Sequence, residues 1–113
     1  MSKRKFIHFL NDILTSSEKV IILTKDKSYE EFIKDWVVVD ATIRNLEIIG
    51  EAVKKLPTNL KKRYSHIEWR KIAGLRDILI HEYFGINYKI LWDIVKNKIP
   101  NLKEQIEKII KEY

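Results

Sequence analysis

One short stretch of the chain combines side chains that can bind phosphate and transfer protons. It contains Arg76, Asp77, His81 and Tyr83 within eight residues. A histidine exchanges protons near neutral pH, and an arginine presents a permanently charged, forked group that matches phosphate oxygens. Metal-independent cleavage of RNA needs a base for the 2′-hydroxyl, an acid for the leaving oxygen and a cation beside the phosphoryl group. These residue types therefore make phosphodiester chemistry one expectation for the stretch.

The spacing of the four residues would bring them together on a helix. Residues seven apart, such as Arg76 and Tyr83, then share a face, and Asp77 and His81 lie one turn apart. We expect a helix over residues 69–84 that carries all four. A solvated helical face with an ordinary Asp77–His81 pair explains the same pattern, so spacing alone leaves the catalytic and the structural interpretations open.

Helical patterning extends over most of the chain, because apolar residues recur at intervals of three and four. Ser28 and Glu31 have the spacing of a capping box, and Pro57 can end the helix that begins there. Gly50 lies inside that helix, where we expect a neighbouring backbone to pack closely. The expected helices cover residues 6–23, 28–56, 69–84, 87–95 and 100–110, with a short helical turn within 59–67. Asn87 can cap the helix over 87–95, and Pro100 suits the first turn of the helix over 100–110. We predict an all-α, up-and-down bundle of four to six helices.

Composition places the chain among folded proteins. It has 113 residues, 45% of them hydrophobic and 34% charged, which predicts one domain over residues 1–113. It has no cysteine, so we expect a reducing compartment such as the cytoplasm, and no apolar run approaches the roughly 20 residues that span a bilayer. His8 and His66 have no partners at metal-ligand spacing, so we assign no metal and no cofactor. Three tryptophans occupy apolar positions and are expected in the core: Trp36, Trp69 and Trp92.

The formal charge of +6 makes a polyanionic partner plausible. Two basic segments could guide RNA to a cleavage site, residues 3–5 and 61–63. A solvated basic surface explains these segments equally well.

The Arg76-x4-His81-x-Tyr83 pattern resembles the signature of the HEPN superfamily, and specifically of its HepT-like toxins. Two further blocks agree in order and spacing, at residues 41–52 and 69–77. The resemblance extends over roughly residues 3–110, and the blocks together are far more specific than an arginine–histidine pair alone.

The resemblance implies a homodimeric, metal-independent endoribonuclease toxin whose two active helices form one composite cleft at the dimer interface. Arg76 and His81 would be its catalytic pair. Tyr83 matches the tyrosine that accepts AMP from a partner minimal nucleotidyltransferase, the MntA antitoxin. Such a modification would add negative charge and bulk beside Arg76 and so inhibit RNA cleavage.

Three further residues are expected to support the pair. Asp77 could orient His81, although Asn is also frequent at this position in the family. Arg44 and Glu51, with Glu47 between them, could form a network that supports the active helix or the dimer; an exposed charged face is the alternative. A different function also stays open, that of a non-catalytic binding or adaptor subunit of a nucleotidyltransferase complex.

Overall fold

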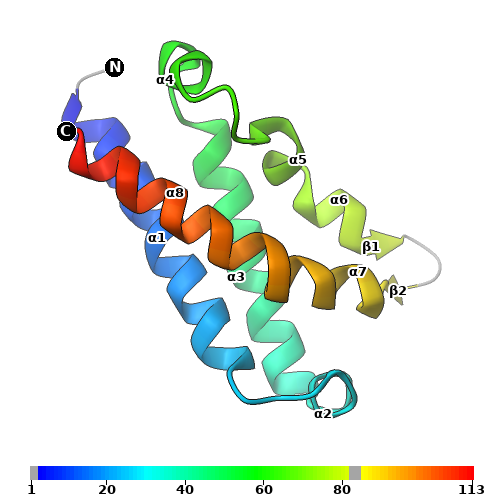
Figure 1. Ribbon diagram of the computed structural model, residues 1–113. Coiled ribbons are helices and arrows are strands. Elements are labelled where there is room, and N and C mark those ends of the chain that lie inside the picture. The colour runs from blue at the N-terminus through cyan, green and yellow to red at the C-terminus, as the bar shows by residue number, and fades with distance from the viewer. Residues whose placement is uncertain (1–2, 82–84) are drawn as a thin grey trace.

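Helices make up nearly all of the computed structural model, which describes residues 3–81 and 85–113 (Figure 1). In chain order, the helical segments are α1 (Lys3–Thr24), α2 (Tyr29–Lys34), α3 (Trp36–Lys54), α4 (Thr58–Arg63), α5 (Trp69–Ala73), α6 (Leu75–Leu79), α7 (Tyr88–Asp93), the π-helix η1 (Ile94–Lys98) and α8 (Ile99–Lys111). A two-stranded antiparallel ribbon joins α6 to α7, formed by β1 (Ile80–His81) and β2 (Gly85–Ile86). The all-α fold class predicted from the sequence is confirmed.

The two long helices α1 and α3 run antiparallel, and α8 crosses them on one side (Figure 1). Their facing sides supply most of the hydrophobic core, where each fully buried aliphatic or aromatic side chain stabilises the fold by about 1.5–3 kcal/mol. The largest side chains with essentially no exposed surface are Phe32, Leu10, Ile13, Leu46, Ile49, Leu79, Leu91, Ile99, Ile106 and Ile109. Within the described residues, no helix is both long enough and apolar enough to cross a membrane.

A capping box begins α2, as the sequence predicted. The Ser28 hydroxyl accepts a hydrogen bond from the Glu31 backbone N–H at 3.1 Å, and the Glu31 carboxylate accepts one from the Ser28 N–H at 2.9 Å. The hydrogen bonds from Ser28 lower the pKa of Glu31. This pair fixes where the chain turns from α1 towards the central helix.

The helix expected over residues 28–56 is divided at Asp35, so that prediction was wrong in its extent. The Asp35 backbone ends α2, and its carboxylate accepts a hydrogen bond from the Val38 N–H at 3.2 Å to begin α3. Trp36 is the first residue of α3, directly after this break. Trp36, expected in the core, is 72% exposed, whereas Trp69 is buried and Trp92 is partly buried against Phe32.

Gly50 allows α3 and α5 to pack backbone against backbone, as the sequence predicted. A Cβ atom at Gly50 would lie 3.1 Å from the carbonyl oxygen of Ala73 and 3.3 Å from that of Ile72. Any larger residue would therefore push α5 away from the central helix.

The C-terminal helical segment changes its winding at η1, just before Pro100. The Ile99 N–H bonds to the carbonyl of Ile94, five residues earlier, and Pro100 has no N–H with which to continue the α-helical pattern. Pro100 occupies the first turn of α8, where it was expected. Asn87 caps α7 as predicted, because its side chain accepts a hydrogen bond from the Ile90 N–H.

Candidate functional site

The predicted catalytic stretch begins in α6 and continues into β1. The backbone of Arg76 belongs to α6, and the backbone of His81 belongs to β1, paired with Gly85. Tyr83 lies outside the described residues. The prediction of one helix over residues 69–84 was therefore wrong, because the helix is interrupted at Gly74, ends at Leu79 and is followed by the extended residues of β1.

Local backbone interactions explain why this helix is interrupted and then ends. Gly74 closes α5, with its N–H bonded to the carbonyl of Arg70 at 3.1 Å. At the end of α6, the carbonyl of Leu79 accepts a hydrogen bond from the Asn87 N–H at 2.9 Å, which draws the chain into the ribbon. Gly85 has φ +76°, a conformation that favours glycine and suits a reversal of the chain.

Asp77 lies on the side of α6 that faces α3. It lines a small hollow of about 110 Å³ together with Glu47, Glu51 and Lys54. The Lys54 ammonium pairs with Glu51 at 3.3 Å. Three carboxylates and one ammonium group line the hollow, so its net charge is negative and disfavours a bound anion.

The ion pairs expected between Arg44 and the carboxylates of α3 are not formed among the described residues. Arg44 is exposed and forms no ion pair with Glu47 or Glu51 within the described part of the chain, while Glu51 pairs with Lys54. A supporting role for Arg44 and Glu51 stays a prediction, and it would act through the exposed face of α3.

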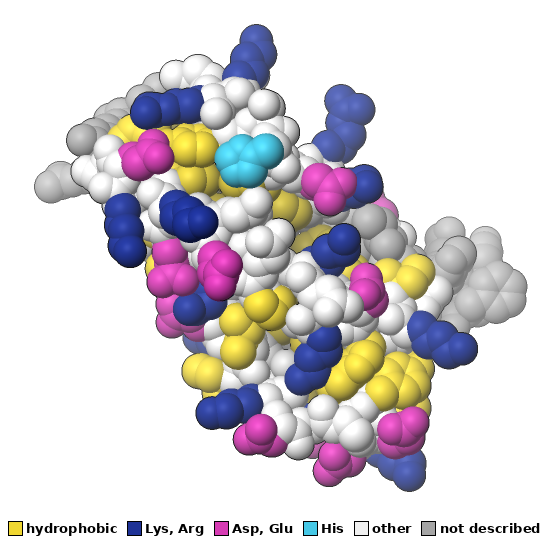
Figure 2. Space-filling model, viewed as in Figure 1, with side chains coloured by type: hydrophobic (Ala, Val, Ile, Leu, Met, Phe, Trp, Pro, Cys, Tyr) yellow, Lys and Arg dark blue, Asp and Glu magenta, His cyan; other side chains and the backbone are white. Residues whose placement is uncertain are grey.

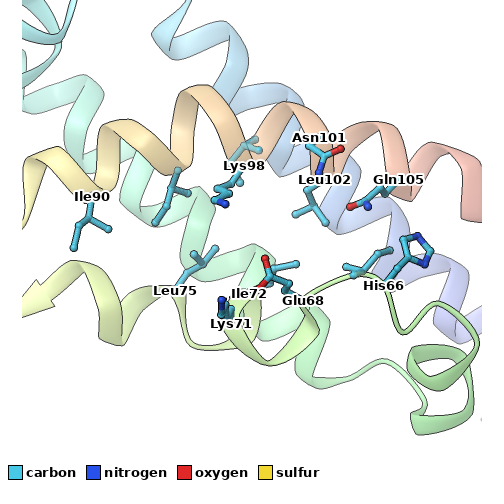
Figure 3. A pocket seen from close by; sticks show the side chains of 13 residues that line it. His66, Glu68, Lys71, Ile72, Leu75, Ile90, Lys98, Asn101, Leu102 and Gln105 are labelled. Carbon is cyan, nitrogen blue, oxygen red and sulfur yellow. Dashed lines mark ion pairs between the residues drawn. The ribbon is translucent and has the colours of Figure 1, made fainter.

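A larger, apolar groove lies on the opposite side of the α5–α6 segment, with a volume of about 250 Å³. Isoleucine and leucine side chains from α5, α6 and the α7–η1–α8 segment form its walls, with Ile90 at one end and His66 and Gln105 at the other (Figure 3). The Lys71 ammonium and the Glu68 carboxylate pair at its edge, 2.7 Å apart. Residues 66–75 and 90–105 build this groove, and no local sequence pattern indicates that they meet.

The histidines of the described helices and loops occupy separate surroundings. His8 lies 3.7 Å from Asp12 one turn along α1, and the His66 ring lies beside the ring of Tyr64. Among the residues whose placement is described, no group of three or more acidic, histidine or cysteine side chains is arranged to hold a metal ion.

Comparison with known proteins decides the family. A family model described as ribonuclease HepT-like matches residues 13–109. The chain belongs to this family. The matched range includes the positions of Arg76, His81 and Tyr83.

Individual relatives support the HepT-like assignment over nearly the whole chain. Two proteins of Methanocaldococcus jannaschii, each named as a candidate RNase, are 50% and 48% identical to this chain; both alignments cover 99% of it, and 93% and 97% of the relatives. A protein of Thermococcus cleftensis named as a candidate ribonuclease HepT is 42% identical, covering 96% of this chain and 99% of the relative. No solved structure gives a significant match.

Proposed function

We propose that this HepT-like protein is a metal-independent endoribonuclease of a toxin–antitoxin pair, with Arg76 and His81 as its catalytic residues. The observation that carries the proposal is the match to the ribonuclease HepT-like family over residues 13–109, a range that contains both residues. The names of the relatives agree with RNA cleavage as the activity.

The proposed reaction uses the ribose 2′-hydroxyl as nucleophile. A neutral His81 takes its proton, and the oxygen forms a bond with the adjacent phosphorus. The bond from phosphorus to the 5′ oxygen of the next nucleotide breaks, and that oxygen receives a proton from a protonated imidazole. Arg76 stabilises the negative charge on the remaining phosphoryl oxygens. The products are a 2′,3′-cyclic phosphate and a 5′-hydroxyl.

A homodimer would supply two imidazoles to one cleft, one as base and one as acid. The exposed face of α3 supports such a dimer, because its first residues, Trp36 and Val37, are 72% and 57% exposed. Helical spacing places Trp36 on the side of α3 that also carries Glu47 and Glu51, which border α6. A second copy covering this face would bring the two α6 segments near each other.

Regulation by a minimal nucleotidyltransferase antitoxin completes the proposal. The phenolic oxygen of Tyr83 would bond to the α-phosphorus of ATP, and pyrophosphate would leave. The attached AMP places negative charge near Arg76 in sequence, where it would compete with RNA phosphate. Co-expression with such an enzyme should add the mass of AMP to wild-type protein and not to Tyr83→Phe.

Cleavage of a defined RNA in EDTA tests the proposed function. We expect fragments that end in a 2′,3′-cyclic phosphate, identified by mass spectrometry, and no cleavage where the nucleotide carries a 2′-deoxyribose. RNA that stays intact at high protein concentration would contradict a ribonuclease and favour the adaptor function.

A further inference from the structure

A shallow, open groove between α4 and α5, outside the predicted catalytic stretch, is lined by four basic residues and by Glu68. It has a volume of about 480 Å³, and Lys61 and Lys62 contribute to it from α4, with Arg70 and Lys71 from α5. The two lysines of α4 are eight or more positions from the two basic residues of α5, and the loop between the helices brings them together. Lys and Arg side chains project around the end of the molecule that carries α4 and α5 (Figure 2).

Three of the four cations in this groove are available to an anionic ligand. Lys71 is paired with Glu68 at 2.7 Å, and this pairing raises the pKa of Lys71 and lowers that of Glu68. Lys61, Lys62 and Arg70 form no ion pair within residues 3–81 and 85–113. We refer to these three residues as the α4–α5 cations.

Arg63 is adjacent to Lys62 but contacts the C-terminal end of the chain. Its guanidinium donates a hydrogen bond to the Tyr113 hydroxyl at 3.1 Å and lies 3.4 Å from the Glu112 carboxylate. The basic run at residues 61–63 is therefore divided, with Arg63 directed towards the C-terminal end of α8 and the two lysines towards α5.

The chemistry of the groove fits a phosphate backbone better than a nucleobase. Trp69 lines it but is only 7% exposed, and its indole N–H is used in a 3.1 Å hydrogen bond to the Tyr64 carbonyl. No open aromatic face is therefore available from Trp69 for stacking on a base, whereas lysine and arginine bind phosphates of any sequence.

The groove lies close in the chain to the proposed catalytic residues. Arg70 lies in α5, which continues through Gly74 into α6, the segment that contains Arg76. Negative charge gathers where α6 meets α3, around Glu47, Glu51 and Asp77. An RNA strand leaving the cleavage site is repelled from that hollow and attracted along α5 towards α4.

We propose that the α4–α5 cations bind the phosphate backbone of RNA next to the scissile bond, as a sequence-independent extension of the active site. This inference rests on the proposed function. It assigns Lys61, Lys62 and Arg70 to substrate affinity and leaves the chemical step to Arg76 and His81.

Salt dependence of RNA binding tests this inference without requiring cleavage. The probe is a fluorescent RNA with 2′-O-methyl groups throughout, which has no 2′-hydroxyl nucleophile. The groove variant is Lys61→Gln/Lys62→Gln/Arg70→Gln. The matched control, Lys19→Gln/Lys25→Gln/Lys34→Gln, loses the same charge from exposed positions on α1, the following turn and α2, at the opposite end of the molecule (Figure 1).

The plot of log Kd against log salt should be less steep for the groove variant than for wild type by about 2, since each phosphate contact contributes roughly 0.7 for single strands. The control should keep the wild-type slope, and restoring arginine at position 70 in the groove variant should recover about a third of the difference. Equal slopes for groove variant and control would overturn the inference.

Cleavage measurements separate this inference from the proposed function. On a dinucleotide, whose only phosphate is the scissile one, the groove variant should cleave at the wild-type rate, while cleavage of a long RNA weakens through KM. A loss on the dinucleotide would overturn the inference by placing these residues in the chemistry. Binding with the expected slopes but no cleavage by wild type would instead overturn the proposed function alone.

Discussion

Gly50 and Ala73 bring the central helix and the approach to the candidate site into backbone contact. A Cβ at Gly50 would lie 3.1 Å from the Ala73 carbonyl oxygen, closer than packed side chains tolerate without movement. Since α5 leads into α6, this contact helps to set where Arg76 is placed relative to α3.

Replacing Gly50 with alanine should therefore destabilise the protein despite the higher helix propensity of alanine. We expect the free energy of unfolding to fall by about 1–3 kcal/mol, the usual cost of overpacking. Urea unfolding at fixed protein concentration measures it. Gly74→Ala is the matched control, because a Cβ there meets its nearest atoms at 3.6 and 3.9 Å. Equal losses in the two variants would contradict the packing argument.

Asp35 should contribute more to stability than an ordinary surface aspartate, because it ends α2 and caps α3. Asp35→Ala removes the acceptor for the Val38 N–H, and we expect a loss of about 1 kcal/mol in the free energy of unfolding. Asp40→Ala, at an exposed position inside α3, should change it little. A similar loss at both positions would remove the capping explanation.

Tyr64 should make the protein lose stability at high pH. Burial, together with its hydrogen bond to the Glu112 carboxylate, raises the pKa of Tyr64 to about 12. An unfolded tyrosine ionises near pH 10, so the unfolded chain loses this proton first. The stabilisation is complete below about pH 10 and disappears as the pH rises through the folded-state pKa.

Ultraviolet titration of tyrosinate checks this pKa. The absorbance step near pH 12 should vanish in Tyr64→Phe and persist in Tyr88→Phe, whose side chain is 37% exposed. Persistence of the step in Tyr64→Phe would mean that another tyrosine is responsible for it.

The proposed dimer predicts that Trp36→Ser weakens self-association without unfolding the chain. Trp36 is 72% exposed, so its loss costs the isolated protomer little, whereas an aromatic side chain at an interface is a frequent source of affinity. Sedimentation equilibrium should show a higher dimer dissociation constant for Trp36→Ser. Ile22→Ser, equally exposed on α1, serves as the comparison. A Trp36→Ser protein that dimerises as well as wild type would exclude this face of α3.

Local signals in the sequence predicted the fold well where the interactions are local. Ser28 with Glu31, Asn87, and Pro100 act on their own helix ends, and all were placed correctly. Close packing at Gly50 was also predicted, because a glycine inside a helix has a cost that a close neighbour explains.

The errors occur where a helix end depends on a side chain or strand pairing that the pattern does not reveal. Asp35 divides a continuous apolar pattern because it caps α3, and Trp36, which directly follows it, is exposed. The end of α6 depends on the bond between Leu79 and Asn87 and on the ribbon at Gly85, so the periodicity before Leu79 gives no warning of it.

The grouping of the α4–α5 cations likewise depends on contacts that the local sequence pattern does not reveal. The sequence shows the two lysines as part of a basic run, but the fold places them in one groove with Arg70 and directs Arg63 towards Glu112. Distance along the chain does not predict which cations share a groove.

The most direct test of the catalytic assignment is the initial rate of cleavage of one defined RNA in EDTA by wild type, Arg76→Ala and His81→Ala, with Lys19→Ala, at an exposed position on α1, as a folded control. Loss of the proton-transferring imidazole should lower the rate by about 10²–10⁴-fold, with a comparable loss for Arg76→Ala. The control should retain activity within a small factor. Cleavage at the wild-type rate by either Arg76→Ala or His81→Ala would contradict the assignment.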